Sequence, residues 1–180
     1  DEQRAVSVIE RMRLLLKRRE SQLEALAVNQ LISEVAKLLN TEIQMHHASL
    51  RIDIADGLPD VYGDRVHLQQ VILNLLLNSL DALNGKSEKQ RQIVIRASQT
   101  TDGMVEFAVV DRGTGVAPEQ LPHLFEPFYT TKENGMGTGL AISKTIIEMH
   151  GGKILATNNP DGGTSVRFTV KVAPPEEILA

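Results

Sequence analysis

The chain has 180 residues, of which 42% are hydrophobic and 23% charged, values that are ordinary for a folded globular protein. This length allows one hydrophobic core with an appended element, and it excludes two domains of ordinary size. The net charge of −4 argues against nucleic-acid binding, and the absence of cysteine excludes disulfides and thiolate metal sites. The sequence has no apolar run of about 18 residues and no signal-peptide pattern, so we expect no membrane contact from this segment.

Residues 1–20 carry apolar side chains at helical spacing, which predicts an amphipathic helix. The stripe consists of Ala5, Val8, Ile9, Met12, Leu15 and Leu16. A helix this short is only marginally stable alone in water, so we expect it to pack against a partner, either a second chain or another helix. The alternative is that it folds back on the rest of the chain.

The next segment is predicted to contain a helix and a strand. Residues 21–28 form a connector or a short strand, and Asn29 is placed to cap a helix that runs to His46. Residues 50–54 alternate with period two, which predicts a half-buried strand, and the DGLP sequence that starts at Asp56 predicts a turn. The buried face of the helix is expected to comprise Leu31, Ile32, Val35, Leu38, Leu39 and Ile43.

The most informative stretch is VILNLLLNSLDAL, residues 71–83, which predicts an apolar helix with a polar stripe. Asn74, Asn78 and Asp81 are four and three residues apart and therefore share one helical face. Burying an amide without a partner costs about 1–3 kcal/mol, so a polar group must lie against this face. Either neighbouring backbone or a ligand supplies it. Two further polar residues extend the stripe backwards, Gln70 and His67.

Asp64 is predicted to cap this helix, and the Asn84-Gly85 pair is predicted to end it. Residues 93–97 and 104–110 then predict two antiparallel strands, the second of which leads directly into Asp111. Loops at strand ends commonly carry binding residues. The tip of this hairpin is therefore a candidate site.

Three prolines interrupt residues 116–136, which predict a short helix over 119–125 and then a mobile lid. A further helix is predicted over residues 138–150. Residues 153–157 and 164–172 predict a closing hairpin.

Strands that pair in sequence, with helices between them, predict an α+β fold. We expect a two-layer sandwich of one mixed β-sheet with helices on one face, preceded by an N-terminal helix extension.

Glycines at positions 135, 137 and 139 precede the predicted helix over 138–150. A glycine-rich turn that leads into a helix N-terminus is suited to anion binding, because backbone amides point outward and the helix dipole favours negative charge. Such runs also serve simply as turns. The chain lacks the GxxxxGK[ST] pattern, and no GxGxxG follows its first strand, so the two commonest phosphate-binding loops are excluded.

Two side chains carry oxygen atoms suited to a magnesium nucleotide. Mg²⁺ retains waters and bridges phosphates, so one side-chain carbonyl such as that of Asn78 is a sufficient protein ligand. Asp111 lies at a strand end before glycines, and its carboxylate is suited to accept a hydrogen bond from an adenine amine. The alternative is that Asp111 only caps a turn.

Four segments in register resemble the nucleotide-binding boxes of sensor histidine kinases: NLLLNSLDAL, DRGTG, FEPFYTTK and GMGTGLAIS. These kinases share the Bergerat ATP-binding fold with gyrase and the heat-shock chaperone ATPases. The resemblance covers residues 23–172 and is most similar to soluble oxygen- and aromatic-sensing kinases. It implies an ATP-binding catalytic domain over residues 23–180, preceded over residues 1–22 by part of the second helix of a dimerisation and phosphotransfer bundle.

The resemblance implies a role for each matching residue. Asn78 is the Mg²⁺ ligand, Asn74 faces the phosphates, Asp111 binds the adenine amine, and Thr164 supports Asp111 through water. In the lid, Lys132 is a candidate phosphate ligand, and Phe125 and Phe128 anchor the hinge. The expected ATP-binding residues are Asn74, Asn78, Asp81, Asp111, Gly113, Gly115, Val116, Lys132, Gly135, Met136, Gly137, Thr138, Gly139, Leu140 and Thr164.

Two departures from the family pattern refine this expectation. ATP-hydrolysing relatives carry a glutamate base four residues before the magnesium asparagine, but here that position is Asn74, which favours transfer to an acceptor over hydrolysis. The family's acceptor histidine precedes Glu or Asp on the first bundle helix. No histidine here has that context, which indicates a fragment without the acceptor: His46, His47, His67, His123 and His150.

The leading hypothesis is a cytoplasmic histidine kinase fragment, whose parent is either soluble or membrane-tethered. It transfers the γ-phosphate of Mg-ATP to an upstream histidine, for relay to a response-regulator aspartate, and dimerises through the N-terminal helix. The alternatives are a Bergerat-fold ATPase and a non-catalytic nucleotide-sensing module.

Overall fold

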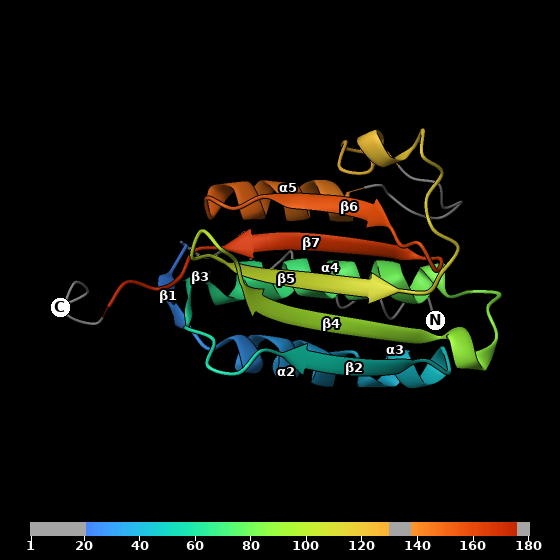
Figure 1. The fold of residues 1–180 in the computed structure, drawn as a ribbon, viewed down its shortest axis with the longest axis horizontal. Coiled ribbons are helices and arrows are strands. Elements are labelled where there is room, and N and C mark those ends of the chain that lie inside the picture. Colours follow the sequence, from blue (N-terminus) through green and yellow to red (C-terminus); the bar gives the residue numbers. More distant parts are fainter. Residues whose placement is uncertain (1–20, 130–137, 176–180) are drawn as a thin grey trace.

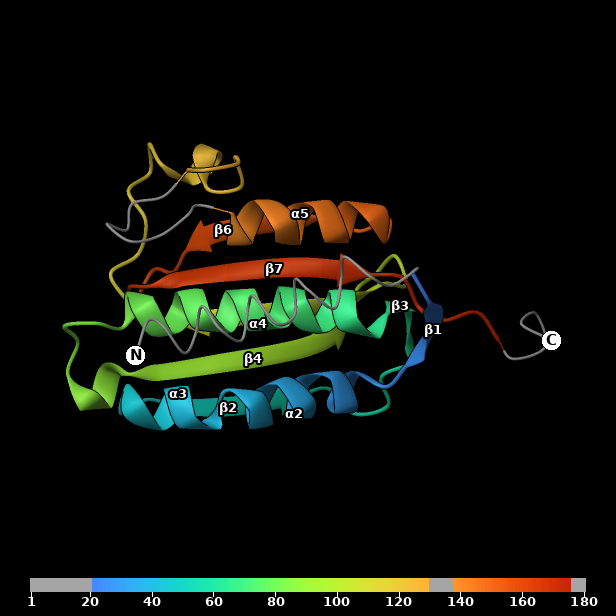
Figure 2. The same ribbon diagram turned by 180° about the vertical axis from the view of Figure 1, so that it is seen from behind.

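A five-stranded mixed sheet and a layer of helices on one of its faces form the fold (Figures 1 and 2). The structure, a computed structural model, describes residues 21–129 and 138–175. The strands are β1 (Leu23–Leu26), β2 (Ser49–Ile54), β3 (Val61–Asp64), β4 (Gln92–Gln99), β5 (Val105–Asp111), β6 (Ile154–Asn158) and β7 (Thr164–Val170). The helices are α2 (Val28–Leu38), α3 (Asn40–Met45), α4 (Arg65–Ala82) and α5 (Gly139–Met149), with 3-10 turns at Glu88–Gln90 and Leu121–His123.

The large sheet has the order β2-β4-β5-β7-β6, and a separate two-stranded sheet pairs β1 with β3. β2 runs parallel to β4, whereas the other neighbours in the large sheet are antiparallel. Figure 2 shows the helices together on one face of this sheet. The predicted α+β sandwich of a mixed sheet and helices is confirmed. The predicted N-terminal helix over residues 1–20 lies outside the described residues.

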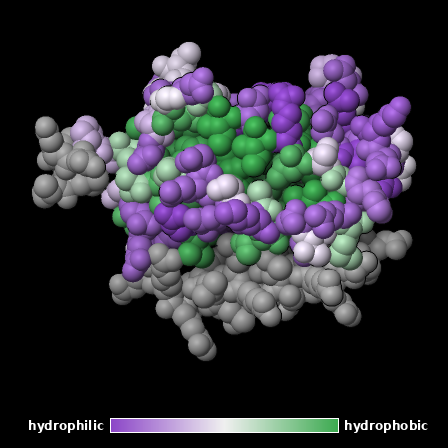
Figure 3. Space-filling view, turned by 90° about the horizontal axis from the view of Figure 1, so that it is seen from below, coloured by the Kyte–Doolittle hydropathy of each residue, from purple (hydrophilic) through white to green (hydrophobic). Residues whose placement is uncertain are grey.

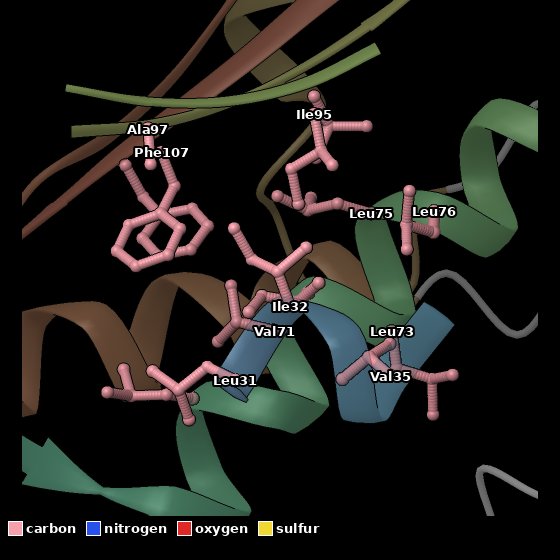
Figure 4. Close-up of a cluster of buried hydrophobic side chains, with 14 of the residues drawn as sticks. Leu31, Ile32, Val35, Val71, Leu73, Leu75, Leu76, Ile95, Ala97 and Phe107 are labelled. Carbon is pink, nitrogen blue, oxygen red and sulfur yellow. The ribbon is translucent and has the colours of Figure 1, made fainter. Parts of the chain in front are cut away.

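Alternation along the strands builds the core between sheet and helices. In β5, Val105, Phe107 and Val109 are buried and face the helices, and Phe107 stacks on Phe168 of β7 with ring centroids 4.8 Å apart. Figure 4 shows Ile95 and Phe107 of the sheet opposite apolar side chains of α2 and α4. Because α4 packs against β5, α2 and α5, it is buried nearly all round. Within the described ranges, no helix combines the length and apolarity needed to cross a membrane.

The predicted helix from Asn29 to His46 is two helices. The break at Leu39 buries that side chain fully and leaves Leu38 53% exposed, so the predicted burial of Leu38 is wrong. α2 starts after Ala27, without a side-chain cap, so Asn29 is not the N-cap.

The side of the molecule that includes β2 and α2 exposes apolar surface between hydrophilic bands (Figure 3). The large exposed apolar residues of α2, α3 and β2 are Leu38, Met45 and Ile52. β2 is an edge strand, and the helices cover it incompletely, so its alternation produces only partial burial of Leu50 and Ile54.

The structure differs from the sequence-based expectation in two further elements. β3 was not predicted, because its short sequence VYGD has little strand signal and its partner β1 lies far away in the sequence. The predicted helix over residues 119–125 is a 3-10 turn, Leu121–His123.

Asp64 joins three parts of the fold at the start of α4. Its Oδ1 accepts hydrogen bonds from the backbone N–H groups of Val66 and His67, as the predicted N-cap requires. Its Oδ2 accepts from Gln22 N at 2.8 Å, just before β1. Its own backbone N–H donates to Nε2 of buried His150, whose Nδ1 is 2.7 Å from a carbonyl oxygen of α5. One residue therefore links the chain entry, α4 and α5.

Replacing Asp64 by alanine should lower the free energy of unfolding by about 1–3 kcal/mol, because the helix loses its cap and Gln22 N–H loses its acceptor. Chemical denaturation measures this change. Asp60→Ala, at an exposed aspartate in the preceding loop, is the matched control and should change stability by less than about 0.5 kcal/mol. Equal losses in the two variants would contradict the role of Asp64.

Candidate functional site

Helix α4 contacts both of the other segments that the sequence singled out. Near its middle, Asn74 Nδ2 donates to the carbonyl oxygen of Gly139 at 3.2 Å, where α5 begins. One turn further on, Ser79 Oγ donates to Asp111 Oδ2 at 3.2 Å. The polar stripe of α4 therefore lies against the start of α5 through Asn74, and Ser79, outside the stripe, contacts the DRGTG turn. The fold brings together these three of the four predicted segments.

Asp111 occupies the last inward-facing position of β5, after the buried Val105, Phe107 and Val109. Its exposed fraction is only 5%. Its Oδ1 accepts from the backbone N–H groups of Gly113 at 2.9 Å and Thr164 at 3.2 Å. Burial raises the pKa of Asp111, and the three hydrogen bonds that it accepts oppose this shift. The fold thus holds a carboxylate among fixed donors at the edge of the core.

The bond from Gly113 N–H shows that Asp111 also caps its own turn, which was the alternative considered for it. The turn-capping and binding interpretations are compatible, because Ser79 and Thr164 reach the same carboxylate from α4 and β7. The contact from Thr164 is direct and comes from its backbone, whereas the sequence suggested support through water.

The glycines of this region are required by close packing. A Cβ added at Gly113 would lie 2.5 Å from the carbonyl oxygen of Ala82, at the end of α4. A Cβ at Gly163 would lie 2.0 Å from the carbonyl oxygen of Asp111. Gly115 has φ +75°, a conformation that favours glycine. The requirement at Gly113 therefore arises from contact with α4, independently of any ligand.

Sequence reasoning missed the residues that hold the DRGTG turn in place. Asn158 makes two hydrogen bonds to the backbone of Val116: its Oδ1 accepts from Val116 N–H, and its Nδ2 donates to Val116 O. Asn159 Nδ2 donates to the carbonyl oxygen of Asp111 at 3.1 Å. Both asparagines belong to the predicted β6–β7 hairpin, where Asn is common for conformational reasons, so the sequence carried no distinct signal. Ser79 was equally overlooked, although a serine on an apolar helix is such a signal.

Asn74 ties α4 to α5. Besides Gly139, its Nδ2 contacts Ser143 Oγ at 3.3 Å, and Ser143 Oγ donates to Gly139 O at 2.9 Å. Backbone thus satisfies part of this amide, which was the alternative considered for the stripe. Among the described residues, Asn74 Oδ1 and both polar side-chain atoms of Gln70 are buried without a hydrogen-bond partner. The contact between α4 and α5 therefore includes a buried amide, that of Asn74.

The remaining predicted residues differ in exposure. Asn78 is half-buried and Asp81 is exposed on α4, while Thr138 and Leu140 are half-buried at the start of α5. Phe125 is half-buried, but Phe128 is 78% exposed with φ +65° and so does not anchor a hinge on the described residues. The predicted residues that lie outside the described ranges are Lys132, Gly135, Met136 and Gly137.

The donor set fits a cation that brings most of its own ligands. Residues 21–129 and 138–175 contain no cluster of three or more His, Asp or Glu side chains that could hold a metal ion. A half-buried amide such as Asn78 supplies one neutral oxygen, which suits Mg²⁺ already bound by phosphates and water.

Comparisons with known proteins agree with this arrangement. Residues 63–174 match the family described as "Histidine kinase-, DNA gyrase B-, and HSP90-like ATPase". The sensor protein FixL of Bradyrhizobium diazoefficiens is 38% identical over 170 residues, which are 94% of this chain and 33% of that protein. The sensor histidine kinase TmoS of Ectopseudomonas mendocina is 34% identical over 96% of this chain and 18% of its own length. The chain thus spans about a third or less of these relatives.

Solved structures of histidine kinases are similar in fold to this chain. The catalytic domain of histidine kinase ThkA, in a nucleotide-free form, has a TM-score of 0.73 and 29% identity, and the match covers 86% of this chain and 97% of that one. Full-length ShkA in complex with AMPPNP has a TM-score of 0.76 and 27% identity, over 87% of this chain and 32% of that one. The polar stripe of α4, the buried Asp111 and the matched residues lead to one conclusion: the chain belongs to the family of histidine kinase-, DNA gyrase B- and HSP90-like ATPases, and its relatives are sensor histidine kinases.

Proposed function

We propose that this chain binds Mg-ATP and transfers the γ-phosphate to a histidine on an upstream helix of its parent protein. A response-regulator aspartate then takes the phosphoryl group. The observation that carries the proposal is the buried Asp111 carboxylate, held by three donors beside the polar stripe of α4. Further support comes from the sensor histidine kinase relatives and from ShkA, whose structure contains AMPPNP.

In this proposal Asp111 accepts a hydrogen bond from the exocyclic amine of adenine, and Asn78 contributes a side-chain oxygen to Mg²⁺. The metal ion neutralises phosphate charge when bound. The phosphates lie toward the start of α5, where Thr138, Gly139 and Leu140 follow the glycine-rich segment. Val116, Gly115 and Asp81 border the nucleotide, and Lys132 of the lid contacts the terminal phosphates.

Asn74 favours transfer over hydrolysis. An amide cannot take a proton from water at neutral pH, and Asn74 Nδ2 already donates to Gly139 O and Ser143 Oγ. Its role is to hold the first turn of α5 against α4. Water in the site therefore lacks the general base that glutamate supplies at this position in the ATP-hydrolysing relatives.

The domain arrangement is part of the proposal. Residues 1–22 belong to the dimerisation and phosphotransfer bundle, and residues 23–180 form the catalytic domain. The parent protein is a homodimer and performs this reaction in the cytoplasm.

The reaction is tested with labelled Mg-ATP and a peptide or domain that carries the acceptor helix of the parent protein, added in trans. We expect label on the acceptor histidine and little label on the chain itself. Asn78→Ala should reduce transfer at least about tenfold, because it removes the side-chain oxygen proposed for the metal. Steady phosphate release without acceptor labelling would instead favour an ATPase.

Asp111→Asn should weaken ATP binding about tenfold or more, because the amide opposes a donor where the carboxylate accepts a charge-assisted hydrogen bond. Stability should be unchanged or higher, since the amide oxygen still accepts from Gly113 and Thr164 and no buried charge remains. Calorimetry measures binding and thermal unfolding measures stability. Unchanged ATP affinity in a folded variant would refute the role of Asp111.

ATP affinity should fall on acidification at a pH above the ordinary Asp value of 3.8, because burial raises the pKa of Asp111 and protonation removes the acceptor. Stability responds with the opposite sign. The folded state binds this proton more tightly than the unfolded state, so the contribution of Asp111 is present below 3.8 and is lost as pH rises through the raised pKa. Titration of binding and unfolding against pH measures both trends, and each should be weaker in the Asp111→Asn control, which cannot titrate at this position.

A further inference from the structure

Ser79 is buried on α4, with an exposed fraction of 5%, and it directly follows Asn78. Its hydroxyl donates to Asp111 Oδ2 at 3.2 Å, which joins the helix to the end of β5. Ser79 donates to the Asp111 carboxylate through its side chain, whereas Gly113 and Thr164 donate through their backbone amides. Ser79 therefore controls one oxygen of the carboxylate independently of the DRGTG turn.

The lone pairs of the carboxylate can be accounted for one by one. An ionised carboxylate offers about four acceptor positions, two on each oxygen. Gly113 N–H and Thr164 N–H occupy both positions of Oδ1, and Ser79 O–H occupies one position of Oδ2. One position on Oδ2 is left for a ligand. Since that position accepts, the group placed there must be a donor.

We propose that Ser79 is a positioning residue that sets base specificity: it holds Asp111 Oδ2 so that the remaining lone pair accepts one N–H of an exocyclic amine. The inference rests on the proposed function, because the nucleotide is assumed to lie at Asp111. It predicts selection of a base with an amine at this point over one that has hydrogen or a carbonyl there. Ser79 acts through Asp111 and contacts no reacting atom.

The alternative is that Ser79 only satisfies a buried carboxylate. A structural role of this kind would affect every nucleotide equally, whereas a positioning role affects only nucleotides that carry the amine. The purine riboside triphosphate has the same sugar and phosphates as ATP but lacks the amine. Comparison of the two ligands therefore separates the two roles.

The experiment measures the Kd of Mg-ATP and of the magnesium purine riboside triphosphate by calorimetry near neutral pH. In Ser79→Ala we expect ATP binding to weaken about tenfold and analogue binding to change less than about twofold. Ser79→Thr keeps the hydroxyl and should retain the preference for ATP. Ser98→Ala, on the exposed outer face of β4, is the matched control and should change neither affinity.

A second measurement follows the pH profile of ATP binding. The hydrogen bond from Ser79 lowers the pKa of Asp111, so its loss should move the acidic fall in ATP affinity to higher pH in Ser79→Ala. This shift reports the loss of the hydrogen bond itself, so the comparison of the two nucleotides is the measurement that separates the two roles. Thermal unfolding of each variant confirms that the comparison concerns folded protein.

The outcomes separate this inference from the proposed function. If Ser79→Ala weakens both nucleotides equally, or keeps the full preference for ATP, the inference is overturned while the proposed function stands. If the folded wild type binds neither nucleotide, the proposed function itself fails. A loss of preference for ATP in Ser79→Ala, with an intact preference in Ser98→Ala, supports the inference.

Discussion

The burial of one carboxylate against α4 is the constraint on which the site depends. An isolated charge removed from water is strongly unfavourable, so Asp111 is retained at the inner edge of the sheet only because the surrounding elements donate to it. Those donors come from the DRGTG turn, from β7 and from α4. Their convergence requires the turn to approach α4 closely, which explains the glycine at position 113. The same interaction therefore determines both the local backbone and the chemistry of the candidate site.

Asn74 connects α4 to α5, as Ser79 connects α4 to Asp111. Its amide spans the gap to Gly139 and Ser143, so α5 begins at a fixed point beside the polar stripe. A buried amide oxygen and the buried Gln70 side chain remain unsatisfied nearby within the described residues. Buried polar groups are usually hydrogen-bonded to protein or to ordered water.

The layers of the fold could be predicted from the sequence, because helices and strands are indicated by periodicity and by caps, and both are local signals. The α4 helix with its Asp64 cap and the strand that ends at Asp111 follow from such signals. The helix break at Leu39 could not be predicted from such signals, because it depends on whether Leu38 or Leu39 enters the core. Pairing of β1 with β3, and the clamps from Asn158 and Asn159, depend on contacts between distant segments. The family boxes identified the candidate site residues, whereas the network that supports them required three-dimensional information.

The shared use of Asp64 has a mechanical consequence. The carboxylate that caps α4 also accepts a hydrogen bond from Gln22 N–H, and β1 begins at the next residue. The same side chain therefore fixes the starts of both β1 and α4. Through His150 the same residue is coupled to the C-terminal end of α5. Asp64 therefore joins Gln22 to two helices whose opposite ends carry Ser79 and Gly139.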